Sequence, residues 1–140
     1  MGAAIALDRG IMVDTSSMKR IEEPSGEDMM FRADSGVVLE DAYKRFDREA
    51  LFFAHDPWTR PIATIGGAIS TNGLGYVGAK YGSIGMQLLA VEAVLPNGTL
   101  LKTRPAQFSS TGLDLRRLFL GTEGLFRNNH RSRFTAVSKA

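Results

Sequence analysis

The sequence contains no cysteine, which excludes disulfide bonds, thiolate metal sites and a cysteine nucleophile. It also contains no run of about eighteen apolar residues, so we expect no membrane span. Met1 is followed by neither a basic segment nor an apolar stretch, and no secretory signal is visible. Together these absences favour a cytoplasmic protein.

Acidic residues are missing from the end of the chain. Residues 127–140 contain four basic residues and no acidic one, whereas the whole chain carries a formal net charge of +2. The preceding part of the chain is therefore slightly acidic. A short basic tail is more often a solvated segment than a binding site, so we expect no nucleic-acid partner.

The residues that are present have the composition of one globular domain, with 44% hydrophobic and 23% charged residues in a chain of 140. Apolar residues recur at helical spacing over 39–50, which predicts an amphipathic helix. Short apolar runs predict strands at 11–13, 29–33 and 88–95. A Pro-Asn-Gly turn then predicts that 99–103 returns as a hairpin partner. This mixture predicts an α+β fold with antiparallel pairing.

The segment 63–75 reads ATIGGAISTNGLG, with four glycines and no charged residue. Backbone N–H groups in a glycine-rich turn before a helix can hold a phosphate, and a glycine lets a ligand approach the main chain. Tight turns and helix–sheet contacts explain the same glycines equally well. The spacing fits neither the dinucleotide fingerprint nor the P-loop, so the pattern by itself names no ligand.

Five blocks resemble the PCMH-type FAD-binding domain of the vanillyl-alcohol oxidase / p-cresol methylhydroxylase superfamily: GAAIALDRGIMVDTSSMKRI at 2–21, HDPWTRPIATIGGAISTNGLG at 55–75, KYGSIG at 80–85, VEAVLPNGTLLKTR at 91–104 and STGLDLRRLFLGTEG at 110–124. The similarity is greatest to its glycolate oxidase subunit, D-lactate dehydrogenase and alkyldihydroxyacetonephosphate synthase group. It runs from about Gly2 to Phe126. The resemblance implies an α+β domain, mainly the second subdomain of the family, which holds FAD in an extended form.

The resemblance also implies which residues contact the cofactor. A loop opening with Asp and Pro passes the flavin, the glycine pair and the residues before it lie against the isoalloxazine and pyrophosphate, and a Glu-Gly pair begins the segment at the adenine. In this sequence these residues are Asp56, Pro57, Thr64, Ile65, Gly66, Gly67, Thr71, Asn72, Gly73, Glu123 and Gly124. We expect no catalytic residue and no metal ligand. His55 is interpreted as a structural residue, because a lone histidine commonly satisfies local hydrogen bonds.

Two arginines near the end of the matched region require a separate interpretation. Arg116 and Arg117 look like a phosphate clamp, but neighbouring helical residues point about 100° apart. A solvated helix face is the preferred interpretation. The alternative places one of the two arginines near a phosphate of the cofactor.

The sequence departs from the family pattern at both ends. The family has a glycine-rich pyrophosphate loop before the block that matches Gly2, and a substrate domain after the FAD-binding domain. We therefore interpret 1–126 as a partial domain without turnover of its own. Where the family has GIITEA, this chain has RNNHRS at 127–132. One inserted base interconverts the two, so we interpret 127–140 as a frameshifted reading and expect it to be disordered or loosely packed.

The sequence thus predicts an FAD-binding fragment of a flavin-dependent oxidoreductase that oxidises a small 2-hydroxy acid or a related compound. The alternative is a binding or interaction module that keeps the fold without the redox chemistry. Both readings share the glycine segment, and flavin retention alone separates them only in part.

Overall fold

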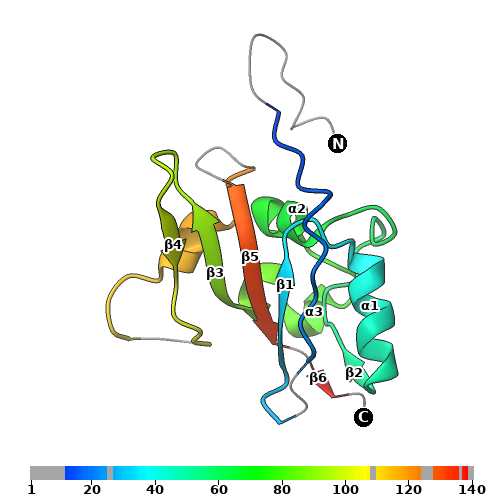
Figure 1. Cartoon of the computed structure of the whole chain (residues 1–140). Coiled ribbons are helices and arrows are strands. Elements are labelled where there is room, and N and C mark those ends of the chain that lie inside the picture. Colours follow the sequence, from blue (N-terminus) through cyan, green and yellow to red (C-terminus); the bar gives the residue numbers. More distant parts are fainter. Residues whose placement is uncertain (1–11, 25–26, 108–109, 124–127, 136, 139–140) are drawn as a thin grey trace.

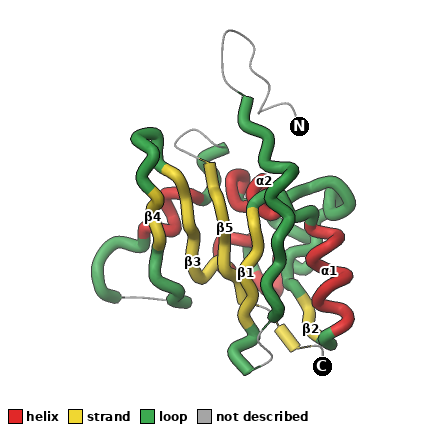
Figure 2. The backbone as a smooth tube through the Cα atoms, in the orientation of Figure 1, coloured by secondary structure: helices red, strands yellow, loops and turns green. Residues whose placement is uncertain are grey.

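The computed structural model describes residues 12–24, 27–107, 110–123, 128–135 and 137–138, the last two ranges by their backbone alone. A four-stranded antiparallel sheet has the order β1-β5-β3-β4, and β2 pairs with β6 in a second, two-stranded sheet. The strands are β1 (Met30–Asp34), β2 (Leu51–Phe52), β3 (Leu88–Val94), β4 (Leu100–Lys102), β5 (Asn128–Thr135) and β6 (Val137–Ser138). Figures 1 and 2 show the helices behind the larger sheet and beside it.

The helices are short except for the first. They are α1 (Leu39–Arg48), α2 (Ile65–Thr71), α3 (Gly78–Tyr81), α4 (Ile84–Gln87) and the 3₁₀ helix η1 (Leu115–Phe119). Within the described ranges, none has the length and apolar character needed to cross a bilayer. The mixture of helices with antiparallel strands confirms the predicted α+β class.

Local periodicity predicted several elements well. The helix predicted over 39–50 is α1, and its apolar side is buried through Leu39, Ala42 and Phe46. Acidic residues in its first turn and arginines in its last turn match the helix dipole. The predicted hairpin of β3 and β4 is also confirmed. The strand predicted at 11–13 is wrong at Met12 and Val13, which are exposed and form no strand, because a short apolar run needs a neighbouring strand to pair with.

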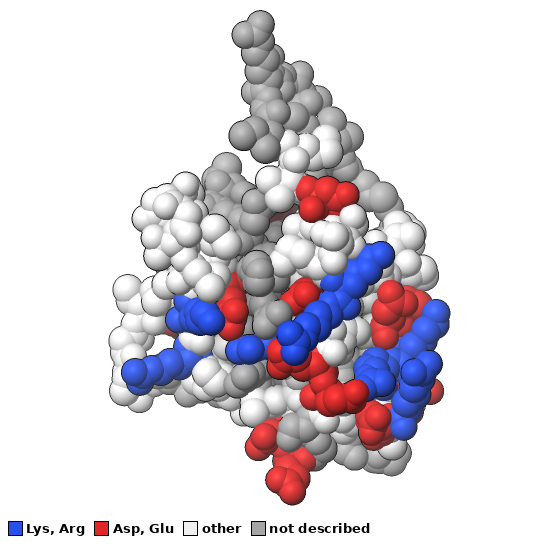
Figure 3. Space-filling model, viewed as in Figure 1, with Lys and Arg blue, Asp and Glu red and all other residues white. Residues whose placement is uncertain are grey.

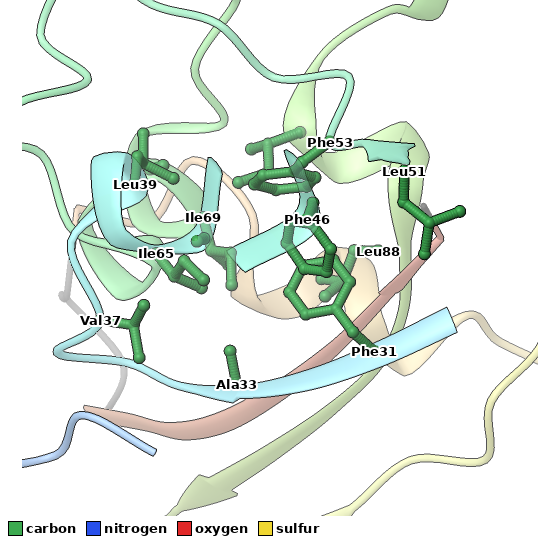
Figure 4. Packing of buried hydrophobic residues seen from close by; sticks show 13 residues of the cluster. Phe31, Ala33, Val37, Leu39, Phe46, Leu51, Phe53, Ile65, Ile69 and Leu88 are labelled. Carbon is green, nitrogen blue, oxygen red and sulfur yellow. The ribbon is translucent and has the colours of Figure 1, made fainter. Parts of the chain in front are cut away.

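Three phenylalanine rings lie at the centre of the main core. The centroid of Phe31, from β1, is 4.4 Å from that of Phe46 in α1 and 5.2 Å from that of Phe53. Figure 4 shows these rings between α1 and the sheet, with Ile65 and Ile69 of α2 in the same cluster. The core therefore fixes α1 and α2 against β1 at the same time.

Charged side chains are paired across the surface of the sheet. Glu92 on β3 lies 3.0 Å from Arg32 on β1 and 3.8 Å from Lys102 on β4. In the view of Figure 3, acidic and basic side chains are interleaved, and the upper left is largely uncharged. On the described part of this face, neither sign forms one continuous patch.

Strand β5 contradicts the prediction that the tail is disordered or loosely packed. Residues 128–135 lie between β1 and β3 and pair with both. Strand pairing uses main-chain N–H and C=O groups, which every residue except proline supplies in full, and the tail contains no proline. The demand of two neighbouring strands for main-chain partners therefore outweighs the missing apolar alternation.

We predict that a chain ending at residue 127 is strongly destabilised, because removal of β5 leaves the facing edges of β1 and β3 without partners. Thermal unfolding followed by far-ultraviolet circular dichroism checks this. The full chain is expected to unfold cooperatively and the shortened chain to show no sharp transition. Equal melting temperatures for the two chains contradict the central position of β5.

Candidate cofactor-binding site

The start of α2 uses its own N–H groups within the chain. The N–H of Ile65 donates to the carbonyl oxygen of Val37 at 2.9 Å, and that of Gly66 donates to Ser35 at 2.8 Å. The third, on Gly67, donates to Oγ1 of Thr64 at 3.2 Å, which makes Thr64 the helix cap. These donors are therefore engaged, and the start of α2 offers a ligand packing surface rather than a phosphate cradle.

The two adjacent glycines of the segment have different surroundings. Gly66 is buried, and a Cβ atom there lies only 2.7 Å from Cβ of Ser35 and 2.9 Å from its carbonyl oxygen. Gly67 is exposed, and a Cβ there meets only Oγ1 of Thr64, at 3.2 Å. Gly66 thus serves the contact between α2 and the end of β1, whereas Gly67 leaves open surface.

One face of α2 is uncovered. Thr64, Gly67 and Thr71 are three and four residues apart, so they share one side of the helix, and each is at least partly exposed. The hydroxyl of Thr71 donates back to the carbonyl oxygens of Gly67 at 3.1 Å and Ala68 at 3.2 Å. Because the helix itself engages both threonine hydroxyls, this face, here called the α2 face, suits a flat ring held by van der Waals contact.

The C-terminal end of α2 turns at Asn72, which adopts a left-handed conformation with φ 49°. Its Oδ1 accepts a hydrogen bond from the N–H of Gly85 at 3.3 Å. The N–H of Gly73 donates to the carbonyl oxygen of Ala68 at 3.0 Å and closes the helix. Asn72 therefore ties the end of α2 to α4.

The second predicted segment runs beside this end of the helix. The N–H of Gly121 donates to Ile69 at 3.3 Å, and that of Glu123 donates to Ser70 at 2.8 Å. Glu123 is thus brought next to the Thr71–Gly73 group, although the two segments are far apart in the sequence. Gly124 lies outside the described residues.

Asp56 and Pro57 lie in a loop that is anchored to α1. The carboxylate of Asp56 pairs with Arg60 at 3.2 Å, and Arg60 also pairs with Glu40 of α1 at 2.7 Å. The carbonyl oxygen of Asp56 accepts from the N–H of Tyr76 at 2.8 Å. Asp56 is therefore engaged within the protein, and it positions the loop beside the segment that follows α2.

His55 precedes this loop and is 1% exposed. Burial lowers its pKa from 6.5 to about 4, and the nearby Asp56 opposes this only in part. Among the described residues, its Nδ1 has no hydrogen-bond partner. Its ring packs against Phe53 and lies under Gly73. A buried, neutral imidazole supports the interpretation of His55 as a structural residue.

A cavity of about 810 Å³ adjoins the end of α2. Among the predicted site residues that the structure describes, Asn72 alone lines it. The lining also includes Ser83, Gly85 and Met86 of the α4 region and Leu113, Asp114 and Arg117 of the η1 region. Sequence reasoning missed Ser83 and Leu113. Their spacing carries no signal, because the cavity joins segments that are distant from one another in the sequence.

Arg116 is buried, so the preferred interpretation of a solvated helix face is wrong for this residue. Its guanidinium donates to both carboxylate oxygens of Asp114, at 2.7 and 2.8 Å, and to the carbonyl oxygen of Leu88 at 2.7 Å. The bonds to Asp114 lower the pKa of that carboxyl group. The carbonyl oxygens at the start of β3 need donors, and Arg116 supplies them. Arg117 is exposed, as predicted.

We predict that Gly66→Ala destabilises the protein by about 1–3 kcal/mol, because the added methyl group overlaps Ser35. Gly67→Ala is the matched control. It adds the same atom one residue later, where only Oγ1 of Thr64 is near, at 3.2 Å, and we expect it to be neutral or stabilising by up to about 1 kcal/mol. Urea unfolding of the two variants measures the difference. Equal midpoints contradict the assignment of Gly66 to the helix contact.

We also predict that His55 makes the protein less stable in acid. The unfolded chain, with a His pKa of 6.5, binds a proton that the folded chain accepts only near pH 4, so the free energy of unfolding falls as pH drops from 6.5 to 4. The contribution is on the order of 3 kcal/mol. Unfolding curves at several pH values for the wild type and His55→Gln check it. The substitution is expected to flatten the pH dependence of the free energy of unfolding. An unchanged slope of that free energy against pH contradicts the prediction.

Three comparisons with known proteins show what this chain is similar to. A sequence profile described as FAD binding domain matches residues 1–104. The mitochondrial D-lactate dehydrogenase of Arabidopsis thaliana is 35% identical over 88% of this chain and 22% of its own length. The glycolate oxidase subunit GlcD of Bacillus subtilis is 32% identical over 88% of this chain and 26% of its own.

The fold matches as well. A solved structure of alkyldihydroxyacetonephosphate synthase superposes with a TM-score of 0.80 at 22% identity, and the match covers 89% of this chain and 22% of the synthase chain. The present chain spans about a quarter of the length of the curated relatives it matches. The resemblance to the family is thus confirmed by sequence and by fold. This chain belongs to the family of PCMH-type FAD-binding domains, whose cofactor is FAD.

Proposed function

We propose that this chain binds FAD with a ring of the cofactor against the α2 face, Thr64, Gly67 and Thr71. The observation that carries the proposal is the absence of a side chain at the exposed Gly67, between two threonines whose hydroxyls the helix already engages. Such a surface has no side chain at its centre and few unpaired polar groups. Because the chain belongs to a family of FAD-binding domains, we take the ring to be one of the rings of FAD.

The engaged N–H groups at the start of α2 decide which part of the cofactor lies there. A phosphate needs donors, and those of Ile65 and Gly66 are used by Val37 and Ser35. We therefore assign the α2 face to an aromatic ring and place the phosphates elsewhere. The remaining predicted residues, from Thr71 to Gly73 and at Glu123, form a neighbouring contact group at the end of α2.

The proposed reaction is the oxidation of a small 2-hydroxy acid. Its support is that relatives 35% and 32% identical to this chain are named D-lactate dehydrogenase and glycolate oxidase subunit. In that reaction a bound flavin would supply the hydride acceptor for the substrate carbon. The part of this chain is to hold the ring, while the buried His55, with its depressed pKa, does not act as the base.

We further propose that residues 1–126 are a partial domain without turnover of their own. The short span relative to the relatives supports this. The alternative is a non-catalytic binding or interaction module that keeps the same fold without the redox chemistry. The cytoplasmic location stays a prediction, since two relatives carry "mitochondrial" in their names. The frameshift origin of 127–140 also stays a prediction, which the gene sequence decides.

Flavin titration tests the proposal. We expect FAD to bind the wild-type chain and Gly67→Leu to weaken binding about tenfold or more, because the leucine covers the α2 face while the helix tolerates it. The control is Lys44→Leu, which places the same side chain on the exposed side of α1. Flavin fluorescence gives the affinity, and circular dichroism verifies the fold. Equal affinities of the Gly67 and Lys44 variants contradict the assignment.

Reduction of the bound flavin tests the proposed lack of turnover. D-lactate or glycolate is added to the loaded chain, and bleaching of the visible flavin band is followed. We expect retention of the flavin without bleaching. Bleaching by the isolated chain contradicts the proposed lack of turnover.

A further inference from the structure

We propose that the cavity beside η1 is a binding site for a small organic oxyanion, with Arg117 as its charged contact. The cavity lies beyond the α2 face, and it meets the end of that helix only at Asn72. The inference does not require that a flavin ring lies on α2, since it rests on the lining of the cavity alone.

The charged residues that line the cavity carry one more positive charge than negative. Asp114 and Arg116 form a two-point pair at 2.7 and 2.8 Å, and Arg116 donates its other N–H groups to main-chain carbonyl oxygens. Arg117 is the second cation of the lining. Its side chain is 78% exposed, and its Nε lies 3.5 Å from the same carboxylate that Arg116 already holds. The carboxylate thus neutralises Arg116, and the charge of Arg117 faces the cavity rim.

The lining also includes two polar residues outside the η1 region, Asn72 and Ser83. Oδ1 of Asn72 accepts the N–H of Gly85 at 3.3 Å, and the amide NH₂ of the same side chain is a donor group. The hydroxyl of Ser83 is a second donor group of the lining. A cavity lined by an exposed guanidinium and by N–H and O–H donors favours an oxygen anion, phosphate or carboxylate.

Two apolar side chains of the lining are uncovered. Leu113 is 90% exposed and Met86 is 65% exposed, and both line the cavity. At about 810 Å³ the space lies within the range of small-molecule sites. The ligand that fits has an anionic group at Arg117 and an apolar body against Leu113 and Met86. A nucleotide phosphate and a free organic acid both supply this chemistry.

Calorimetric titration with AMP, inorganic phosphate and D-lactate tests the site in the full chain. We expect AMP or D-lactate to bind at millimolar concentration or below, and Arg117→Gln to weaken that binding about tenfold, the usual effect of losing a charged hydrogen bond. Arg117→Lys keeps the charge and is expected to restore most of the affinity. Arg48→Gln is the matched control, since Arg48 is an exposed arginine at the end of α1, which lies beside the β1 edge of the larger sheet in Figure 1, away from β3 and η1.

Binding of AMP in competition with FAD identifies the anion as the cofactor's own phosphate, and binding of AMP or D-lactate alongside FAD identifies a separate ligand. Either result upholds the site. Failure of all three probes to bind, or equal affinity in wild type and Arg117→Gln, overturns it. A third result is that no probe binds, while FAD binding is lost in Gly67→Leu and unchanged in Arg117→Gln. That result overturns this site and leaves the proposed function standing. Probe binding without FAD binding upholds this site and contradicts the proposed function.

Discussion

The close approach of α2 to the end of β1 is the contact on which the rest of the site depends. The N–H of Gly66 donates to the carbonyl oxygen of Ser35 at 2.8 Å, a geometry that leaves no room for a Cβ atom. With this contact in place, Ile65 and Ile69 enter the core beside the phenylalanine rings. The opposite side of the helix is then necessarily turned outward, so one buried contact creates the α2 face.

The same contact determines the chemistry that α2 can offer. A free helix start attracts phosphate through its unpaired N–H groups, but here two of these groups complete the turns that follow β1. The donors for an anion lie instead around the cavity, on Asn72, Ser83 and Arg117. The proposed ring surface and the proposed anion site thus lie on different segments, and an extended dinucleotide needs both kinds of surface.

The sequence predicted the elements whose signal is local. Helix α1, strand β1 and the β3–β4 hairpin follow from the spacing of apolar residues and from one turn motif. It did not distinguish Gly66 from Gly67, because the difference lies in Ser35, a residue from a distant part of the sequence. Arg116 was misjudged for the same reason, since its carbonyl partner Leu88 lies in another element. Strand β5 was missed because main-chain pairing needs little from side chains when two strands leave a gap of one strand width.

The central place of β5 has a consequence for synthesis of the chain. Met30 pairs with Thr135, so the two halves of the larger sheet are joined by a strand that follows all its other strands in the sequence. Until that strand has been synthesised, β1 and β3 expose two strand edges side by side, the arrangement most prone to association with other chains. Folding of the sheet therefore waits for its last strand and is dominated by long-range contacts, which slow it. Nascent chains that have not yet reached β5 are the species for which a chaperone has most to do.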